Sequence, residues 1–216
     1  KKQLPLYKVW GVAAQTGLAT ALHFVITDKT GASIVIEYIK GELKIYDNVA
    51  KVLTNAPTYD WHLINLRNYV SLSNRGGGVI TTSKGTINQI GQGVGMFGLP
   101  GDYTPTSRFV REAFLIHNAL PVKNAAEAAE LTGHILNNVD IPLGAVHEDN
   151  NVYGYTQWIS IKDLTNNKMY FSTYHHRLNF VTIDLSKLFI LDRPMEFKID
   201  DFKHPDNDIT NTLINQ

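Results

Sequence analysis

The chain has 216 residues, of which 20 are basic and 20 are acidic, so its formal net charge is zero. This balance argues against the basic surface of a nucleic-acid-binding domain, and the sequence contains neither a polybasic run nor a long apolar span typical of a membrane segment. The composition includes no cysteine, which excludes disulfides, thiolate metal sites and thiol catalysis by residues of this chain.

The first predicted elements are strands. Residues 22–28 and 33–39 are rich in β-branched and aromatic side chains, and a segment with Asp and Gly separates them, which is typical of a turn. A second tight turn leads to residues 42–47, and 51–55 has the composition of a short fourth strand. We therefore expect an antiparallel meander in this part of the chain.

The pattern changes to a helical period over residues 57–70. Pro57 suits the first turn of a helix, where its missing N–H group costs nothing. The apolar residues recur at helical spacing and predict the buried stripe of an amphipathic helix: Tyr59, Leu63, Leu66 and Val70.

Residues 71–105 are predicted to form a long loop. This segment holds nine of the 16 glycines and shows no sustained period. Gly93, Gly95 and Gly98 match the dinucleotide-binding pattern G-x-G-x-x-G, but that pattern requires a preceding strand and a following helix. The next residues, LPGDYTP, are incompatible with such a helix, so we expect no nucleotide cofactor.

Two helices should follow the loop. The first opens at residues 105–107, and its inner face is formed by Phe109, Ala113, Ile116 and Leu120. The second begins at Asn124, because Asn124 and Glu127 form a capping box, and it runs to about Asn138.

The last part of the chain has a β pattern again. Residues 153–164 and 168–174 flank a hairpin signal, and 179–185 add a further strand. Strands in runs and helices in runs predict an α+β fold. The eight histidines lack the spacing of a metal site, and we expect no bound metal.

Asn55 has two interpretations. An asparagine two residues before Pro57 can simply brace the turn into the helix. Alternatively, its amide N–H₂ group can point into a cleft at the end of a strand, where a neutral donor stabilises a tetrahedral oxyanion. The residues alone favour the structural interpretation and leave the other open.

Arg108 lies at the start of a predicted helix, where the helix dipole disfavours a cation. The guanidinium is either solvated or held by another group, such as the carboxylate of Asp102 or a substrate. Arg111, one helical turn later, is expected to face water.

Three segments of the chain resemble the choloylglycine hydrolase family, which contains conjugated bile acid hydrolases and penicillin V acylases. They are VLTNAPTYDWHLINLRNY (52–69), GMFGLPGDYTPTSRFVREAF (95–114) and YTQWISIKDL with KMYFSTY (155–174). The resemblance covers nearly the whole chain, in order.

The resemblance implies an N-terminal-nucleophile hydrolase fold, an α+β, four-layer αββα sandwich that is incomplete in this chain, and a single domain over residues 1–216. It also implies a reaction. An N-terminal cysteine attacks a linear amide, and an acyl-enzyme forms and is hydrolysed. A conjugated bile acid, penicillin V and an acyl-homoserine lactone are the candidate substrates, and no cofactor is implied.

Carried over by motif, Asn55 matches the family's oxyanion-hole asparagine, and Arg108 matches the arginine of SRFVR, near the thiolate. A cation at that place favours the thiolate over the thiol. The stretch AAQTGLATALHF (13–24) is similar to a loop that borders the acyl pocket, so we expect Leu18 and Leu22 to line it.

The family's nucleophile is expected upstream of Lys1, in a missing N-terminal segment or a separate chain. The alternative is a non-catalytic small-ligand-binding domain, or an inactive fragment, on the same scaffold. The expected partners are a small-molecule amide substrate and, by analogy, further copies in a tetramer, with neither nucleic acid nor a membrane. The compartment stays open, with export suggested only by analogy with Gram-negative relatives.

Overall fold

The computed structural model describes residues 22–191 and, beyond them, residues 193, 194, 196 and 198. The chain divides into two compact units, residues 1–120 and residues 121–216. The single domain over residues 1–216 stays a prediction. In the described part of the chain, none of the helices is both long enough and apolar enough to cross a membrane.

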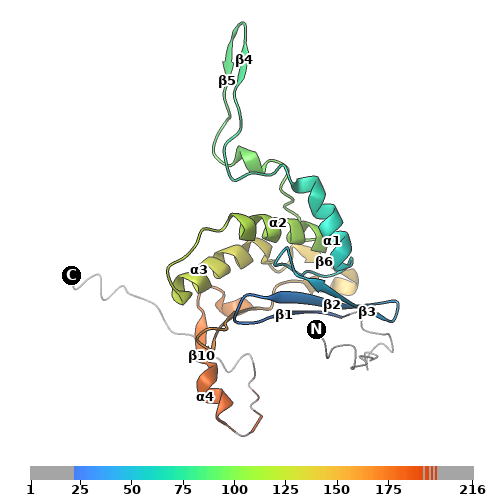
Figure 1. The fold of residues 1–216 in the computed structure, drawn as a ribbon, viewed down its shortest axis with the longest axis vertical. Helices are drawn as coiled ribbons and strands as arrows, with labels where there is room; N and C mark the ends of the chain where they lie inside the picture. The colour runs from blue at the N-terminus through green and yellow to red at the C-terminus, as the bar shows by residue number, and fades with distance from the viewer. Residues whose placement is uncertain (1–21, 192, 195, 197, 199–216) are drawn as a thin grey trace, which may run out of the picture. The chain divides into compact units, whose positions relative to one another are not determined.

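The first unit contains a three-stranded sheet, a short hairpin and two α-helices (Figure 1). Its elements in chain order are β1 (His23–Thr27), β2 (Ser33–Ile39), β3 (Glu42–Asp47), α1 (Tyr59–Leu66), the 3-10 helix η2 (Arg67–Tyr69), β4 (Ile80–Thr82), β5 (Gly85–Ile87), the 3-10 helix η3 (Val94–Met96) and α2 (Pro105–Asn118).

The predicted meander is confirmed by β1, β2 and β3, which pair antiparallel in that order. Ile36 in the central strand faces Phe24 on one side and Ile45 on the other. The fourth strand predicted for residues 51–55 is wrong, since these residues form an irregular connection. Val52 is nonetheless 6% exposed and belongs to the core. The apolar character of the segment therefore reflects burial rather than strand pairing.

The core of the first unit joins both helices to the sheet. It is formed by the buried residues Val35, Val52, Tyr59, Phe109 and Ala113. The ring of Tyr59 in α1 meets that of Phe109 in α2 edge-on, with centroids 6.1 Å apart. This packing places the starts of α1 and α2 side by side.

Helix α1 starts later than predicted. Its N-cap is Thr58, and Pro57 lies before the helix after a cis peptide bond, so the placement of Pro57 in the first turn is wrong. Both carboxylate oxygens of the buried Glu37 accept a hydrogen bond from the Tyr59 N–H group, at 3.1 Å each. A carboxylate there complements the helix dipole. Val70 is 82% exposed, so its predicted burial is wrong, because the helix has ended before it.

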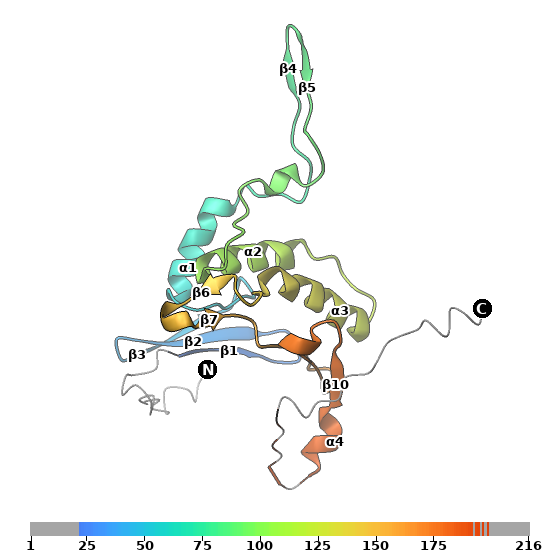
Figure 2. The ribbon, with the colours of Figure 1, turned by 180° about the vertical axis from the view of Figure 1, so that it is seen from behind.

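The predicted glycine-rich loop contains the β4–β5 hairpin, which extends away from α1 and α2 in both views (Figures 1 and 2). At its base, Ser73 donates a main-chain hydrogen bond to Gly95. A Cβ atom on Gly95 would lie 2.2 Å from the Arg75 carbonyl oxygen and 2.5 Å from that of Ser73. The glycine that resembled a nucleotide motif is thus required by the close approach of two chain segments.

Helix α2 begins at Pro105 with Thr104 as its N-cap. The predicted inner residues Phe109 and Ala113 are buried. Leu120 is 78% exposed and follows the end of the helix at Asn118, so its place on the inner face was predicted wrongly.

The second unit contains a helix on a second three-stranded sheet, whose order is β10-β9-β8. Its elements are α3 (Ala125–Leu136), the 3-10 helix η4 (Asn137–Val139), β6 (Val146–His147), the 3-10 helix η5 (Asp149–Asn151), β7 (Tyr153–Gly154), β8 (Trp158–Asp163), β9 (Lys168–Thr173), the 3-10 helix η6 (Tyr174–His176), β10 (Val181–Asp184) and α4 (Leu185–Phe189).

The predicted cap of the second helix is confirmed, because the Asn124 side chain accepts a hydrogen bond from the Glu127 N–H group at 3.0 Å. The hairpin predicted around residues 165–167 is confirmed by the pairing of β8 with β9. Helix α3 packs on β8, where Gly133 lies close to Ile161. The separate runs of strands and helices confirm the predicted α+β class.

Candidate active site

The structure brings together Asn55 and Arg108, the two residues that the sequence singled out. Asn55 lies in the connection between β3 and α1, and Arg108 lies in the first turn of α2. The Nη2 atom of Arg108 donates a hydrogen bond of 2.7 Å to Oδ1 of Asn55. The two residues are 53 positions apart in the chain, so this contact depends on the packing of α1 against α2.

This hydrogen bond determines the orientation of the Asn55 amide. A guanidinium group only donates, so the atom facing Arg108 must be the amide oxygen. The N–H₂ group of Asn55 therefore points away from Arg108, and among the described residues it makes no hydrogen bond. Asn55 is exposed in this chain. The pair thus presents the neutral N–H₂ group of Asn55 as a donor at the surface. The positively charged guanidinium of Arg108 lies on the other side of the same amide.

Arg108 itself is held by the segment that precedes α2. Its Nε atom donates to the main-chain carbonyl of Tyr103 at 3.0 Å. Partial burial, and secondly the nearby charge of Arg111, lower the pKa of Arg108. The guanidinium is consequently fixed at two of its nitrogen atoms and points toward Asn55.

Of the alternatives that the sequence left open for Arg108, a bond to Asp102 is not the one that forms. Its carboxylate accepts hydrogen bonds from the Ser107 hydroxyl at 2.6 Å, the Thr104 hydroxyl at 2.6 Å and the Thr104 N–H group at 2.9 Å. The bond from Ser107, followed by those from Thr104, lowers the pKa of Asp102 to about 2. The carboxylate stabilises the start of α2. The Arg108 side chain instead donates its side-chain hydrogen bond to Asn55.

The expectation that Arg111 faces water is also wrong, because Arg111 is 7% exposed. Its Nη1 atom donates to the carbonyl oxygens of Pro100 at 2.6 Å and Asp102 at 3.1 Å. The buried guanidinium thereby ties α2 to the main chain of the segment that precedes it. The two arginines of SRFVR therefore differ: Arg108 reaches Asn55, and Arg111 anchors the loop.

Sequence reasoning missed His62, which contacts the main chain of Asn55. Its Nε2 atom lies 3.0 Å from the Asn55 carbonyl oxygen, and the side chain is fully buried. The signal that could have identified it is its spacing, since His62 follows Tyr59 by three residues and so falls on the buried face of the helix.

The predicted pocket residues lie at the edge of what the structure describes. Leu18 is outside the described residues, and Leu22 immediately precedes β1 with 60% of its surface exposed. Their role in binding an acyl group stays a prediction.

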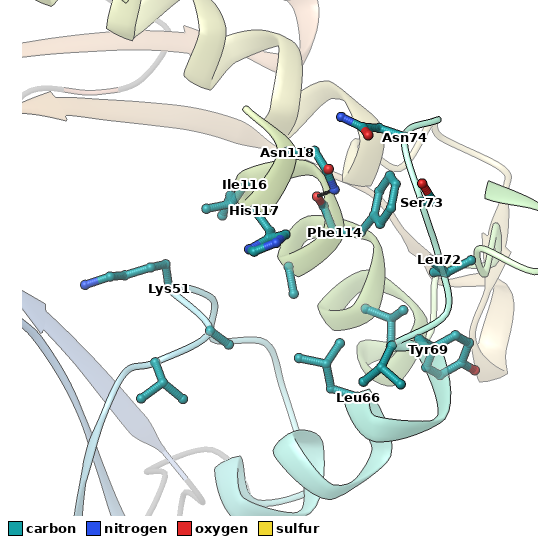
Figure 3. Close-up of a pocket in the computed structure, with 15 residues that line it drawn as sticks. Lys51, Leu66, Tyr69, Leu72, Ser73, Asn74, Phe114, Ile116, His117 and Asn118 are labelled. Atoms are coloured by element: carbon teal, nitrogen blue, oxygen red, sulfur yellow. Dashed lines mark hydrogen bonds between the residues drawn. The ribbon is translucent and has the colours of Figure 1, made fainter. Parts of the chain in front are cut away.

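A cavity of about 680 Å³ lies elsewhere in the first unit (Figure 3). Its walls come from the β3–α1 connection, the end of α1 with η2, and the C-terminal half of α2, where Leu66, Leu72 and Phe114 provide apolar surface. Asn55 and Arg108 lie at the opposite ends of these helices. Neither Asn55 nor Arg108 is among the residues that line this cavity.

The fold is that of the N-terminal-nucleophile hydrolases. A single-residue variant of the conjugated bile acid hydrolase from Clostridium perfringens has a similar structure, with a TM-score of 0.72 and 37% identity over 83% of this chain and 54% of that chain. Penicillin V acylase from Agrobacterium tumefaciens matches with a TM-score of 0.58 and 25% identity over 80% of this chain and 49% of that chain. The predicted fold class is confirmed.

The chain belongs to the choloylglycine hydrolase family of linear amide C–N hydrolases, which it matches over residues 1–204. Among curated relatives, the bile salt hydrolase/transferase of Clostridium perfringens is 40% identical over 171 residues, which cover 78% of this chain and 51% of the relative. The chain thus spans about half the length of the curated relatives it matches. The resemblance deduced from the sequence motifs is confirmed.

Proposed function

We propose that this chain is part of a linear amide hydrolase in which Asn55 donates to the oxyanion and a cysteine from outside these 216 residues is the nucleophile. The single observation that carries the proposal is the 2.7 Å hydrogen bond from Arg108 to Oδ1 of Asn55. It turns the N–H₂ group outward as a donor. Membership of a family of linear amide C–N hydrolases supplies the reaction class.

The proposed reaction has two steps. The cysteine thiolate attacks the amide carbonyl carbon, and the carbonyl oxygen becomes an oxyanion that accepts a hydrogen bond from Nδ2 of Asn55. Collapse of this intermediate breaks the C–N bond, the departing amine takes up the proton that the thiol lost when the thiolate formed, and an acyl–sulfur bond remains. Water then attacks the acyl group, which releases the carboxylic acid and regenerates the thiol.

Arg108 has two tasks in this mechanism. It holds the oxygen of Asn55, so that the amide cannot rotate and present an acceptor to the oxyanion. It also places a positive charge beside the site, which favours the thiolate form of a neighbouring cysteine. Both tasks require the half-buried position that the hydrogen bond to Tyr103 maintains.

The substrate class that we propose is a conjugated bile acid rather than penicillin V. The support is that this chain has a higher sequence identity to the bile acid hydrolases than to the penicillin V acylase. In the structural alignments, the conjugated bile acid hydrolase variant from Clostridium perfringens is 37% identical to this chain, while the penicillin V acylase of Agrobacterium tumefaciens is 25% identical. A pocket for the apolar acyl group then has to include residues other than Asn55 and Arg108.

The test uses the whole protein, including the segment that supplies the cysteine. We expect it to hydrolyse a conjugated bile acid faster than penicillin V. Asn55→Ala should lower kcat by about 10²–10³-fold, because one oxyanion donor is lost. Asn68→Ala is the control, because Asn68 is an exposed asparagine on η2.

An unchanged kcat in Asn55→Ala would remove Asn55 from the mechanism. A wild-type protein that binds a linear amide without cleaving it would instead support the non-catalytic alternative.

A further inference from the structure

His62 joins the two helices that carry the candidate site. It lies in α1 with no exposed surface, and its ring stacks on that of Phe109 in α2, with centroids 4.5 Å apart and planes 7° apart. Phe109 is equally buried and is the next residue after Arg108. The stacked rings therefore link the helix that follows Asn55 to the helix that carries Arg108.

The hydrogen bond of His62 to Asn55 has a defined direction. Nε2 lies 3.0 Å from the main-chain carbonyl oxygen of Asn55. A carbonyl oxygen only accepts, so Nε2 must carry the proton. Nδ1 is buried and has no hydrogen-bond partner among the described residues. Burial lowers the pKa of His62, which agrees with a neutral ring that donates from Nε2 alone.

Thr54 completes the connection to α2. Its hydroxyl donates to the main-chain carbonyl of Pro105, the first residue of α2, at 2.9 Å. The same hydroxyl lies 3.4 Å from Nε2 of His62. Residues 54 and 55 are thus tied to α1 through His62 and to α2 through Pro105.

We propose that His62 is a positioning residue of the active site, whose Nε2–H group holds the main chain of Asn55 where the side-chain amide can meet an oxyanion. The inference rests on the proposed role of Asn55 as the oxyanion donor. His62 holds the main chain of Asn55 and Arg108 holds its side-chain oxygen. Donors that act on a transition state must be held within about 0.5 Å of their working position, and a displacement of about 1 Å can cost about 10²-fold in rate.

The test compares three variants of the whole protein. His62→Phe keeps an aromatic ring against Phe109 but removes the donor, while His62→Gln supplies an amide N–H group without the ring. Tyr59→Phe is the matched control: Tyr59 is fully buried in the same helix, and its hydroxyl makes two hydrogen bonds, neither of them to Asn55.

We expect His62→Phe to lower kcat by about tenfold to a hundredfold, with KM changed by less than about threefold. His62→Gln should recover part of the loss, because the donor is restored. Tyr59→Phe should lower the melting temperature and leave kcat unchanged. A purely structural role of His62 predicts that His62→Phe also leaves kcat unchanged, and that result would overturn the proposal.

A second measurement does not depend on activity. In isotope-labelled protein, the NMR signals of the Asn55 side-chain amide should move or broaden in the His62 variants and stay unchanged in Tyr59→Phe. Unmoved Asn55 signals in His62→Phe, or in His62→Gln if the first variant does not fold, would overturn the inference. A wild-type protein without amidase activity would refute the proposed function, and the NMR comparison would still decide the role of His62.

Discussion

Arg108 donates a 2.7 Å hydrogen bond to Oδ1 of Asn55, across 53 positions of the chain. One residue precedes α1, and the other lies in the first turn of α2, so the bond connects the starts of two packed helices. The contact has a chemical consequence, because it turns the N–H₂ group of Asn55 away from Arg108, where it can donate to a substrate.

Removing the guanidinium should reduce activity more than stability. Arg108→Met loses the bonds to both Asn55 and Tyr103, so we expect kcat in the whole protein to fall by about tenfold to a hundredfold. Arg108→Lys should recover little, because an ammonium group cannot reproduce the rigid fork that reaches two oxygen atoms. The measurement is kcat together with the melting temperature of each variant.

Arg67→Met is the control for this series, since Arg67 is an exposed arginine on η2. Full recovery of kcat in Arg108→Lys would show that only the charge matters, and it would contradict the role of Arg108 in orienting the amide.

The start of α2 should lose stability in acid through Asp102. Hydrogen bonds from Ser107 and Thr104 lower the pKa of Asp102 to about 2, from 3.8. A group with a lowered folded-state pKa stabilises the protein above its unfolded pKa, and that contribution disappears as the pH falls through the folded value. Asp102→Asn should therefore destabilise the protein at neutral pH.

The difference between wild type and Asp102→Asn should shrink from about pH 4 and vanish near pH 2. Urea unfolding at a series of pH values measures it. A difference that stays constant over this range would mean that the Asp102 carboxylate is not stabilised by its charge.

Gly95 should tolerate no side chain. A Cβ atom at this position would lie 2.2 Å from the Arg75 carbonyl oxygen, and that main-chain atom cannot move without displacing the base of the β4–β5 hairpin. We expect Gly95→Ala to lower the free energy of unfolding by about 1–3 kcal/mol, measured by thermal or urea unfolding.

Gly91→Ala is the matched control, because no atom lies within 4 Å of a Cβ atom at that position. Its stability should equal that of the wild type within about 0.5 kcal/mol. Equal stability of the two alanine variants would show that the close approach at Gly95 is not maintained in solution.

Local patterns predicted much of the secondary structure. The enrichment in β-branched and aromatic residues, together with the turn signals, led to β1, β2 and β3, and the Asn124 cap located the start of α3. Both signals depend on neighbours in the sequence. The same reasoning failed for Val70 and Leu120, which continue a helical spacing beyond the end of the helix. Spacing alone does not show where a helix ends, nor which residues of the pattern the rest of the molecule buries.

The sequence by itself determined which side chains could take part in the site, since the motifs around Asn55 and Arg108 identified both residues and their family. Only the tertiary structure decided how these residues pair. The carboxylate of Asp102 is taken by Thr104 and Ser107, two and five positions away, and such local bonds close short loops at little entropic cost. The bond between Arg108 and Asn55 forms only when the buried rings of Tyr59, His62 and Phe109 pack α1 against α2.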